Sequence, residues 1–382
     1  MRIAVPAELD PAETRIAATP ETVKKFIGLG ATVVIEAGAG GHAGYPDADF
    51  AAAGASLAAT RAETLSDADV VLQVRRPDGT SLSGVKAGAA VIAIMDPYGH
   101  EGAIGAIAKA GVHAFAMEFM PRITRAQVMD VLSSQANLAG YRAVIDASSE
   151  FGRGIPMMMT AAGTVPAAKI FIMGVGVAGL QAIATARRLG GIVTATDVRP
   201  ATKEQVESLG AKFVAVEDDE FKQAETSGGY AKEMSKDYQA KQAALVASHI
   251  AKQDIVITTA LIPGRPAPRL VTADMIASMK PGSVLIDLAV ERGGNVEGAV
   301  ANEIVTTANG VKIVGSSNVT KLAATASALY ARNLFAFVET LVDKETKALA
   351  PKWDDELVKA TLLTRDGAIV HPNLLPKEPA AA

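Results

Sequence analysis

The sequence contains no cysteine, and this absence excludes several kinds of site. A disulfide framework, a catalytic thiolate and a zinc ion bound by sulfur all require cysteine. Aromatic residues make up only 4% of the chain, and a formal net charge of -4 leaves no basic surface for the phosphates of nucleic acid. The five histidines show no metal-ligand spacing. We therefore expect no metal site and no nucleic-acid partner.

Long apolar runs are also missing. The longest, residues 170–186, is interrupted by three glycines and a glutamine, and it is shorter than the roughly 20 residues that span a bilayer. The N-terminus enters a strand pattern at once and lacks the layout of a signal peptide. We therefore expect a chain that does not itself cross a membrane, and this composition is compatible with the cytoplasm.

The chain is rich in alanine, valine, isoleucine and glycine, and short β-branched runs alternate with helical stretches. This alternation predicts parallel sheets covered by helices. The length of 382 residues suits two domains. The strands expected in the first domain are residues 2–6, 32–37, 69–74, 89–95 and 112–118. Those expected in the second are 169–174, 192–197, 211–217, 254–261, 283–289 and 311–316.

Gly174, Gly176 and Gly179 form a complete G-x-G-x-x-G motif between an apolar strand and a helix. The next strand ends at Asp197, which completes the βαβ unit that this motif requires. The first glycine permits the turn, the second lets a pyrophosphate approach, and the third lets the helix lie close to the strand. Amide groups at the helix start, Val177 and Ala178 among them, then bind the anion. Asp197 is expected to bind the adenosine ribose and to favour NAD over NADP, although Arg199 could accommodate a 2′-phosphate.

The expected fold is α/β, with two Rossmann-like domains whose parallel sheets are joined by long helices, and with NAD in the cleft. A helix over residues 126–151 is predicted to link the domains, and a helix beginning near residue 324 to return to the first. The predicted domains are residues 1–125 plus 320–382, and residues 126–319. Residues 218–242 form a polar connection, interpreted as a functional loop or as a solvated helical segment without a role.

Together, AGYRAVIDASSEF, PMMMTAAGTVPAAKIFIMGVGVAGLQAIATARRLG and ATDVRPATKEQVESLGAKF resemble the family of alanine dehydrogenases and NAD(P) transhydrogenase alpha subunits. The resemblance extends to PAELDPAETRIAATPETVKKFIGLGATVVIEAGAG near the N-terminus. In alanine dehydrogenases, a lysine in a K-V-K-E-P segment and a histidine after the next strand serve the substrate. At those places this sequence reads Gln73-Val74-Arg75-Arg76-Pro77 and Asp96-Pro97-Tyr98. Oxidative deamination needs proton-transfer groups, and their loss costs orders of magnitude in rate. His100 is the one displaced candidate for such a group.

The segment PRITRAQVMDVLSSQ instead resembles the nicotinamide loop of the transhydrogenase NAD(H)-binding component. This resemblance implies that Arg122, Gln127, Asp130 and Ser133 surround the ring and that Tyr230 belongs to a mobile loop. An Arg122–Asp130 ion pair would respond to the charge of the ring. The cofactor contacts implied by motif and resemblance are Gly174, Gly176, Val177, Ala178, Gly179, Asp197, Val198, Arg199, Gly229, Gln242 and Leu261.

The chain has only one dinucleotide motif, so NADP(H) is expected on a partner subunit. The resemblance implies direct hydride transfer from NADH to NADP⁺, a membrane-spanning alpha-type subunit that couples transfer to proton translocation, and a homodimer docked at the cytoplasmic face of the inner membrane. Two alternatives stay open at this point. One is an amino acid dehydrogenase with a rearranged substrate site, and the other is a regulatory NAD-binding module without catalysis.

Overall fold

The structure, a computed structural model, describes residues 1–222, 234–262, 264–315 and 318–375. Contacts within it divide the chain into two compact units: unit 1 comprises Met1–Gln135 with Thr320–Ala382, and unit 2 comprises Ala136–Val319. The first boundary therefore lies later in the chain than the predicted one at residues 125/126. In the part of the chain that the structure describes, no helix has the length and apolar character needed to cross a membrane.

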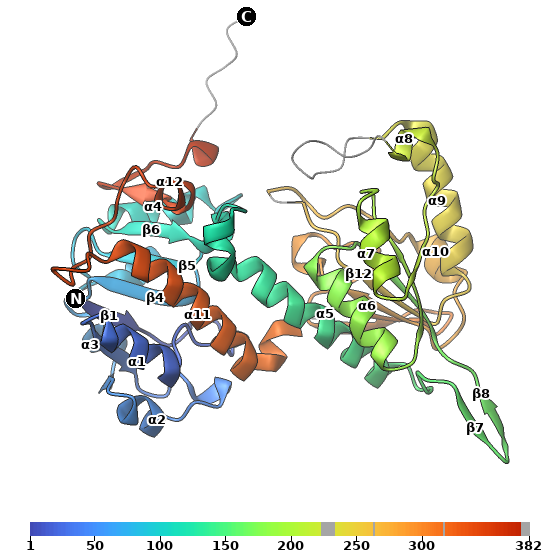
Figure 1. The fold of residues 1–382 in the computed structure, drawn as a ribbon, viewed down its shortest axis with the longest axis horizontal. Coiled ribbons are helices and arrows are strands. Elements are labelled where there is room, and N and C mark those ends of the chain that lie inside the picture. The colour runs from blue at the N-terminus through green and yellow to red at the C-terminus, as the bar shows by residue number, and fades with distance from the viewer. Residues whose placement is uncertain (223–233, 263, 316–317, 376–382) are drawn as a thin grey trace, which may run out of the picture. The chain divides into compact units, whose positions relative to one another are not determined.

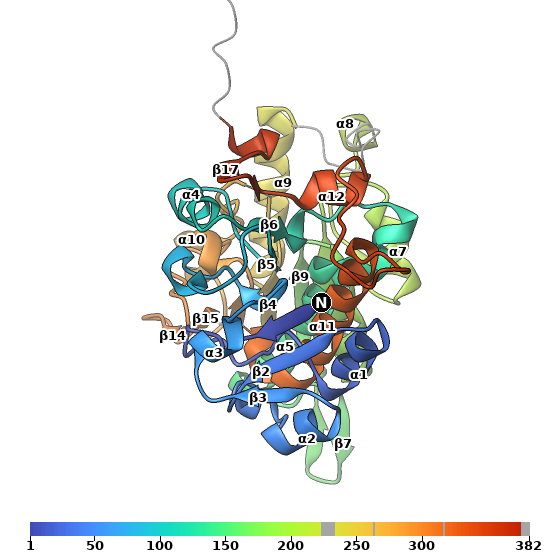
Figure 2. The ribbon, with the colours of Figure 1, turned by 90° about the vertical axis from the view of Figure 1, so that its left-hand side faces the viewer.

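Unit 1 is built on a six-stranded parallel sheet of order β3-β2-β1-β4-β5-β6. Its strands are β1 (Arg2–Val5), β2 (Thr32–Glu36), β3 (Ser56–Ala58), β4 (Val70–Arg75), β5 (Ala90–Ile94) and β6 (His113–Ala116). Its helices are α1 (Pro20–Gly28), α2 (Asp47–Ala52), α3 (Arg61–Leu65), α4 (Glu101–Lys109), α11 (Ala323–Leu341) and α12 (Glu356–Thr361), with a small hairpin of β16 (Thr364–Arg365) and β17 (Ala368–Ile369). Figure 2 shows α1 and α11 on one side of this sheet and α3 and α4 on the other.

The alternation of side chains along each strand explains this layering. Ile3 and Val5 enter the core beneath α1 and α11, whereas Ala4 faces the core beneath α3 and α4. A parallel sheet covered on both faces needs apolar residues at consecutive positions, which is the pattern of the predicted strands. Thr19 caps α1 and Pro20 occupies its first turn.

Unit 2 repeats this architecture with the order β11-β10-β9-β12-β13-β15, and β14 is added antiparallel at the edge. Its strands are β9 (Lys169–Met173), β10 (Ile192–Thr196), β11 (Lys212–Phe213), β12 (Ile255–Thr258), β13 (Val284–Asp287), β14 (Glu303–Thr306) and β15 (Lys312–Gly315). Its helices are α6 (Val177–Arg188), α7 (Thr202–Ser208), α8 (Asp219–Lys222), α9 (Lys236–Ile250) and α10 (Ala273–Ala277). An antiparallel hairpin of β7 (Met158–Thr160) and β8 (Gly163–Val165) extends from this unit (Figure 1).

Both units therefore have the strand order of a dinucleotide-binding fold, and the predicted α/β class is confirmed. The sequence pattern did not indicate β14, because its side chains are largely exposed and lack the apolar run of a buried strand. The single helix predicted over residues 126–151 is wrong at its start. The structure has the 3₁₀ helix η4 (Thr124–Met129) followed by α5 (Val131–Glu150). Asp130 separates them because its backbone is extended, at φ -74° and ψ 91°.

Candidate functional site

The glycine-rich turn lies between β9 and α6, at the carboxyl edge of the unit 2 sheet. Gly174 has φ +103°, and a Cβ there would lie 2.6 Å from Thr259 Oγ1. A Cβ on Gly179 would lie 1.9 Å from the Gly174 carbonyl oxygen, whereas one on Gly176 would meet nothing within 4 Å. The outer two glycines therefore permit the turn and the close helix. The middle one leaves open space where a phosphate could approach the backbone.

The N-terminus of α6 faces this open space without a side-chain cap. Its N-cap is Gly176, so no side chain bonds the amide groups of Val177 and Ala178 in the first turn. Such amide groups, together with the helix dipole, form a site for an anion. Gly140 of α5 packs against this end, because a Cβ on Gly140 would lie 2.0 Å from the Ala178 carbonyl oxygen. Gly140 was not among the predicted site residues, because it is an isolated glycine in a helix and belongs to no recognisable motif.

Asp197 follows β10 and lies beside the glycine turn. Its carboxylate accepts a hydrogen bond of 2.7 Å from the Val175 amide and another of 2.9 Å from the Arg199 amide. The Arg199 guanidinium also binds both carboxylate oxygens, at 2.9 and 3.0 Å. These four hydrogen bonds, two to each oxygen, fill the usual acceptor capacity of a carboxylate, so a hydroxyl would bind here in place of one of the Arg199 bonds. Arg199 is thus held by Asp197. The sequence left open whether Arg199 could accommodate the 2′-phosphate of NADP, and in this structure its guanidinium is already bound to a carboxylate.

Three exposed apolar side chains follow the carboxyl ends of three neighbouring strands in unit 2. Val177, Val198 and Leu261 come after β9, β10 and β12, and they are 39%, 53% and 53% exposed. Exposed apolar groups gathered at such an edge are typical of a ligand groove. Asn295, fully buried, fixes the loop that contains Leu261, because its side chain bonds both the amide and the carbonyl of Ala260. The sequence did not indicate that Asn295 is a site residue, because a single asparagine after two glycines forms no motif.

Gln242 lies in α9, so the end of the polar connection over residues 218–242 is helical, as one of its two interpretations expects. Its amide donates to Thr196 Oγ1 at 3.2 Å and accepts from the Val216 amide at 2.9 Å. It thereby ties α9 to the strand end that precedes Asp197. Gly229 and Tyr230 lie outside the described residues.

The other predicted site residues belong to unit 1. Asp130 ends η4 and caps α5: its carboxylate accepts from the Ser133 amide at 2.9 Å and from the Ser133 hydroxyl at 2.5 Å. Arg122 and Gln127 are exposed on either side of the start of η4. Within the described ranges Arg122 makes no ion pair, so the hypothesised Arg122–Asp130 pair is not formed and Asp130 binds Ser133 instead.

A buried charged cluster occupies the carboxyl end of the unit 1 sheet. Glu13 has a fully buried side chain that binds Arg15 through two bonds of 2.7 Å and Arg75 Nε at 2.8 Å. Burial alone would raise the pKa of Glu13, but its hydrogen bonds and ion pairs with these arginines outweigh burial and lower that pKa. Arg75, in the segment that resembles K-V-K-E-P, is therefore engaged by a carboxylate, and a guanidinium is not a proton-transfer group near neutral pH.

His100 is the remaining candidate acid or base near this edge. Its Nδ1 lies 2.9 Å from the Asp96 carbonyl oxygen and 3.6 Å from the Asp96 carboxylate. The ring is 44% exposed and stands at the start of α4. The contact of its ring with Asp96 in the preceding turn gives His100 a structural role at the start of α4.

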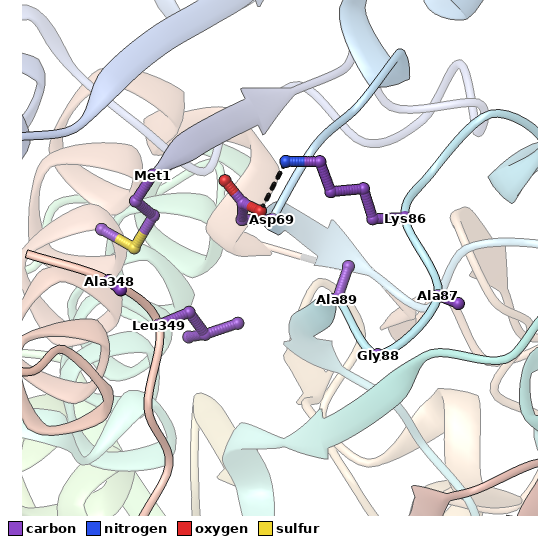
Figure 3. Close-up of a pocket in the computed structure, with 8 residues that line it drawn as sticks. All are labelled: Met1, Asp69, Lys86, Ala87, Gly88, Ala89, Ala348 and Leu349. Carbon is purple, nitrogen blue, oxygen red and sulfur yellow. Dashed lines mark hydrogen bonds and ion pairs between the residues drawn. The ribbon is translucent and has the colours of Figure 1, made fainter.

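A cavity of about 290 Å³ lies at the amino end of the unit 1 sheet, opposite the buried charged cluster. Its lining contains none of the predicted site residues. Figure 3 shows its lining, which includes Met1, Leu349 and the ion pair between Lys86 and Asp69. Met1, Asp69 and Lys86 precede β1, β4 and β5, whereas ligands of open parallel sheets bind at the carboxyl ends of the strands. This cavity is therefore no candidate for the active site.

Comparison with known proteins shows the family of this chain. The model "Alanine dehydrogenase/PNT, N-terminal domain" matches residues 4–139, and "Alanine dehydrogenase/PNT, C-terminal domain" matches residues 143–372. An NAD(P) transhydrogenase alpha subunit of Rhodospirillum rubrum is 56% identical over 98% of this chain and 99% of the relative. A transhydrogenase crystal structure from Sinorhizobium meliloti has a TM-score of 0.88 and 62% identity, covering 97% of this chain and all of the other.

An alanine dehydrogenase of Halomonas elongata is also similar, at 30% identity over 97% of this chain and 95% of the relative. Both family models and the long relatives span the two units described above. The chain belongs to the alanine dehydrogenase/PNT family.

Proposed function

We propose that this chain is the NAD(H)-binding component of a proton-translocating NAD(P) transhydrogenase. It binds NADH, and hydride passes directly to NADP⁺ held on a partner subunit. The observation that carries the proposal is the 56% identity, over 98% of the chain, to a transhydrogenase alpha subunit. The engagement of Arg75 by Glu13 supports it, because that pairing leaves the substrate position of an alanine dehydrogenase without a proton-transfer group.

Unit 2 supplies the features that fit NAD. The uncapped start of α6 offers amide groups to the pyrophosphate, and Gly176 leaves room for it. The Asp197 carboxylate accepts a hydrogen bond from the adenosine ribose in place of one from Arg199, while Val198 and Leu261 offer exposed apolar surface. Asp197 also disfavours a 2′-phosphate. Arg199 is already paired with Asp197 and orients that carboxylate rather than binding a phosphate of its own.

The polar segment of unit 1 orients the nicotinamide. The nicotinamide, when bound, supplies a hydride, and its transfer to a second nicotinamide moves no proton at the reacting carbons. The protein therefore contributes position and electrostatics rather than acid–base chemistry. Gln127 binds the carboxamide and selects the ring face. Asp130 and Ser133, coupled at 2.5 Å, act as one polar group beside it, and Arg122 responds to the charge of the ring.

The partners follow from the reaction. A single chain with one dinucleotide motif needs a second polypeptide for NADP(H), and coupling to proton translocation requires a membrane-spanning subunit. We assign this chain to a homodimer that docks through those subunits at the cytoplasmic face of the membrane. The Rhodospirillum rubrum relative, which matches this chain over almost its whole length, is named as one portion of an alpha subunit, and this supports the division of subunits.

The alternative is an amino acid dehydrogenase, favoured only by the 30% identity to an alanine dehydrogenase. A direct assay separates the possibilities: the purified chain is mixed with its NADP(H)-binding partner, NADH and an oxidised NADP analogue. Hydride transfer is expected. Alanine-dependent formation of NADH by the chain alone would support the dehydrogenase instead. NADH binding without transfer in the reconstituted complex would indicate a regulatory module.

Gln127→Asn tests the assignment of the ring-binding residue. The shorter amide keeps the chemistry but withdraws it by one methylene, so hydride transfer should slow by about a hundredfold. The NADH dissociation constant should change little, because most contacts lie elsewhere. Stopped-flow absorbance measures the transfer and NADH fluorescence measures the binding. An unchanged transfer rate would remove Gln127 from the mechanism.

A further inference from the structure

We propose that Asn333 of α11 is a positioning residue for the Gln127–Ser133 segment. Its side chain bonds the backbone on one side of Asp130 and the Ser134 hydroxyl on the other, and so sets the geometry of the nicotinamide contacts. This inference rests on the proposed function for the role of the segment in binding nicotinamide. The contacts that hold the segment belong to unit 1 alone.

Asn333 is a polar residue on the buried face of an apolar helix. It is 7% exposed, and its neighbours Tyr330, Leu334 and Phe337 are fully buried in the core of unit 1. Burying an amide there costs free energy unless both of its ends are hydrogen-bonded. Both ends are: Nδ2 donates to the Val128 carbonyl at 2.8 Å, and Oδ1 accepts from the Ser134 hydroxyl at 2.7 Å.

These two partners lie on opposite sides of the break between η4 and α5. Val128 belongs to the 3₁₀ turn that contains Gln127, and Ser134 to the first turn of the α-helix that contains Ser133. One side chain thereby clamps two elements whose junction, Asp130, has an extended backbone. A 3₁₀ turn has few internal bonds, and the Asp130 amide reaches the Gln127 carbonyl only at 3.4 Å. The position of Gln127 therefore depends on external contacts: Ala126 and Met129 anchor η4 in the core, and Asn333 is the contact that joins it to α5.

A second bond network supports the same turn from the buried charged cluster. Gln135 Oε1 accepts from Arg15 at 2.8 Å, and its Nε2 contacts the Ser134 hydroxyl at 3.3 Å. Arg15 is in turn held by Glu13. The start of α5 is thus rigid, whereas η4 is joined to it across Asp130 by Asn333. We infer that Asn333 is the residue whose loss releases Gln127 relative to Ser133.

Asn333→Asp keeps the acceptor for Ser134 and replaces the donor to Val128 by a carboxylate oxygen, so the lost hydrogen bond and the repulsion between two acceptors act in the same direction. Amide exchange in the peptide covering residues 124–134 should become about tenfold faster, since losing one buried hydrogen bond changes an opening equilibrium by that order. With the partner present, hydride transfer should slow by about tenfold while the NADH dissociation constant stays within about twofold. Ser134→Ala, a milder change, should alter both readouts in the same direction and to a smaller extent.

Asn309→Asp is the matched control. Asn309 lies in unit 2, and its Nδ2 likewise donates to backbone carbonyls, including that of Ile276 at 3.0 Å. The control should leave exchange in residues 124–134 unchanged. Wild-type exchange in this peptide for both Asn333→Asp and Ser134→Ala would overturn the inference, as would a wild-type rate of hydride transfer in Asn333→Asp. A wild-type chain that transfers no hydride would refute the proposed function instead, and the exchange measurement would still decide whether Asn333 holds the segment.

Discussion

Replacing Gly140 by alanine tests whether α5 must lie directly against the start of α6. The added Cβ would be 2.0 Å from the Ala178 carbonyl oxygen, whereas ordinary contacts begin at 3.4 Å. Because the obstacle is backbone, the two helices must separate by about 1.4 Å, and no side chain can rotate away. The amide groups proposed to bind the pyrophosphate move with Ala178, so the change affects both stability and cofactor affinity.

Two opposing contributions set the size of the effect. Overpacking of this kind costs about 1–3 kcal/mol, while alanine is favoured over glycine inside a helix by up to about 1 kcal/mol. We therefore expect Gly140→Ala to lower the free energy of unfolding of unit 2 by about 1–2 kcal/mol. Displacement of the α6 start should weaken NADH binding by about tenfold, equivalent to about 1.4 kcal/mol.

The assays are urea unfolding followed by circular dichroism and a titration of NADH fluorescence. Gly105→Ala in α4 is the control, because an added Cβ at Gly105 meets nothing within 4 Å. That control should be neutral or stabilising, and it should bind NADH like the wild type. A Gly140→Ala protein with wild-type stability and wild-type affinity would refute the argument for close packing.

Two further predictions concern charged groups. Asp197→Ala should weaken NADH binding by about tenfold in a fluorescence titration, because the ribose loses its acceptor. Unaltered affinity would refute the ribose assignment. Burial raises the pKa of Glu8 from 4.5 to about 7, despite hydrogen bonds from the Val74 and Arg75 amides. The folded state then holds a proton that the unfolded chain has lost, so wild-type stability should fall, relative to Glu8→Gln, as pH rises from about 4.5 to about 7, by at most about 3 kcal/mol. Parallel urea curves for the two proteins across this pH range would contradict the shift.

Sequence patterns predicted much of the fold because parallel sheets impose strong local requirements. Strands buried on both faces need continuous apolar runs, and these identified β1, β4, β9 and β12 to within a few residues. Weak local signals account for the elements that were missed. The exposed edge strand β14 has no apolar run, and Asp130 ends η4 through its backbone conformation rather than through a proline or glycine.

The residues of the candidate site likewise fall into those that a local motif predicts and those that it does not. The role of Gly179 could be predicted because its motif encodes a local turn, and the structure gives the reason in a 1.9 Å approach to Gly174. Asn333 and Asn295 could not be predicted, because each binds backbone groups far away in the chain. The expected Arg122–Asp130 pair is absent from the ion pairs of the described residues for a related reason. A carboxylate at a helix start finds the amide and hydroxyl of Ser133 three residues on, and this local cap satisfies it without Arg122.

By itself, the sequence determined the α/β class, the glycine turn, the acidic residue after the second strand and the family resemblance, since each depends on residues that are close together in the chain. The tertiary structure alone decided which side chains hold the Gln127–Ser133 segment, that Glu13 engages Arg75, and that Gly140 permits the contact at Ala178. These contacts join residues that are distant along the chain. No local spacing encodes them, because they exist only after both sheets and their covering helices have formed.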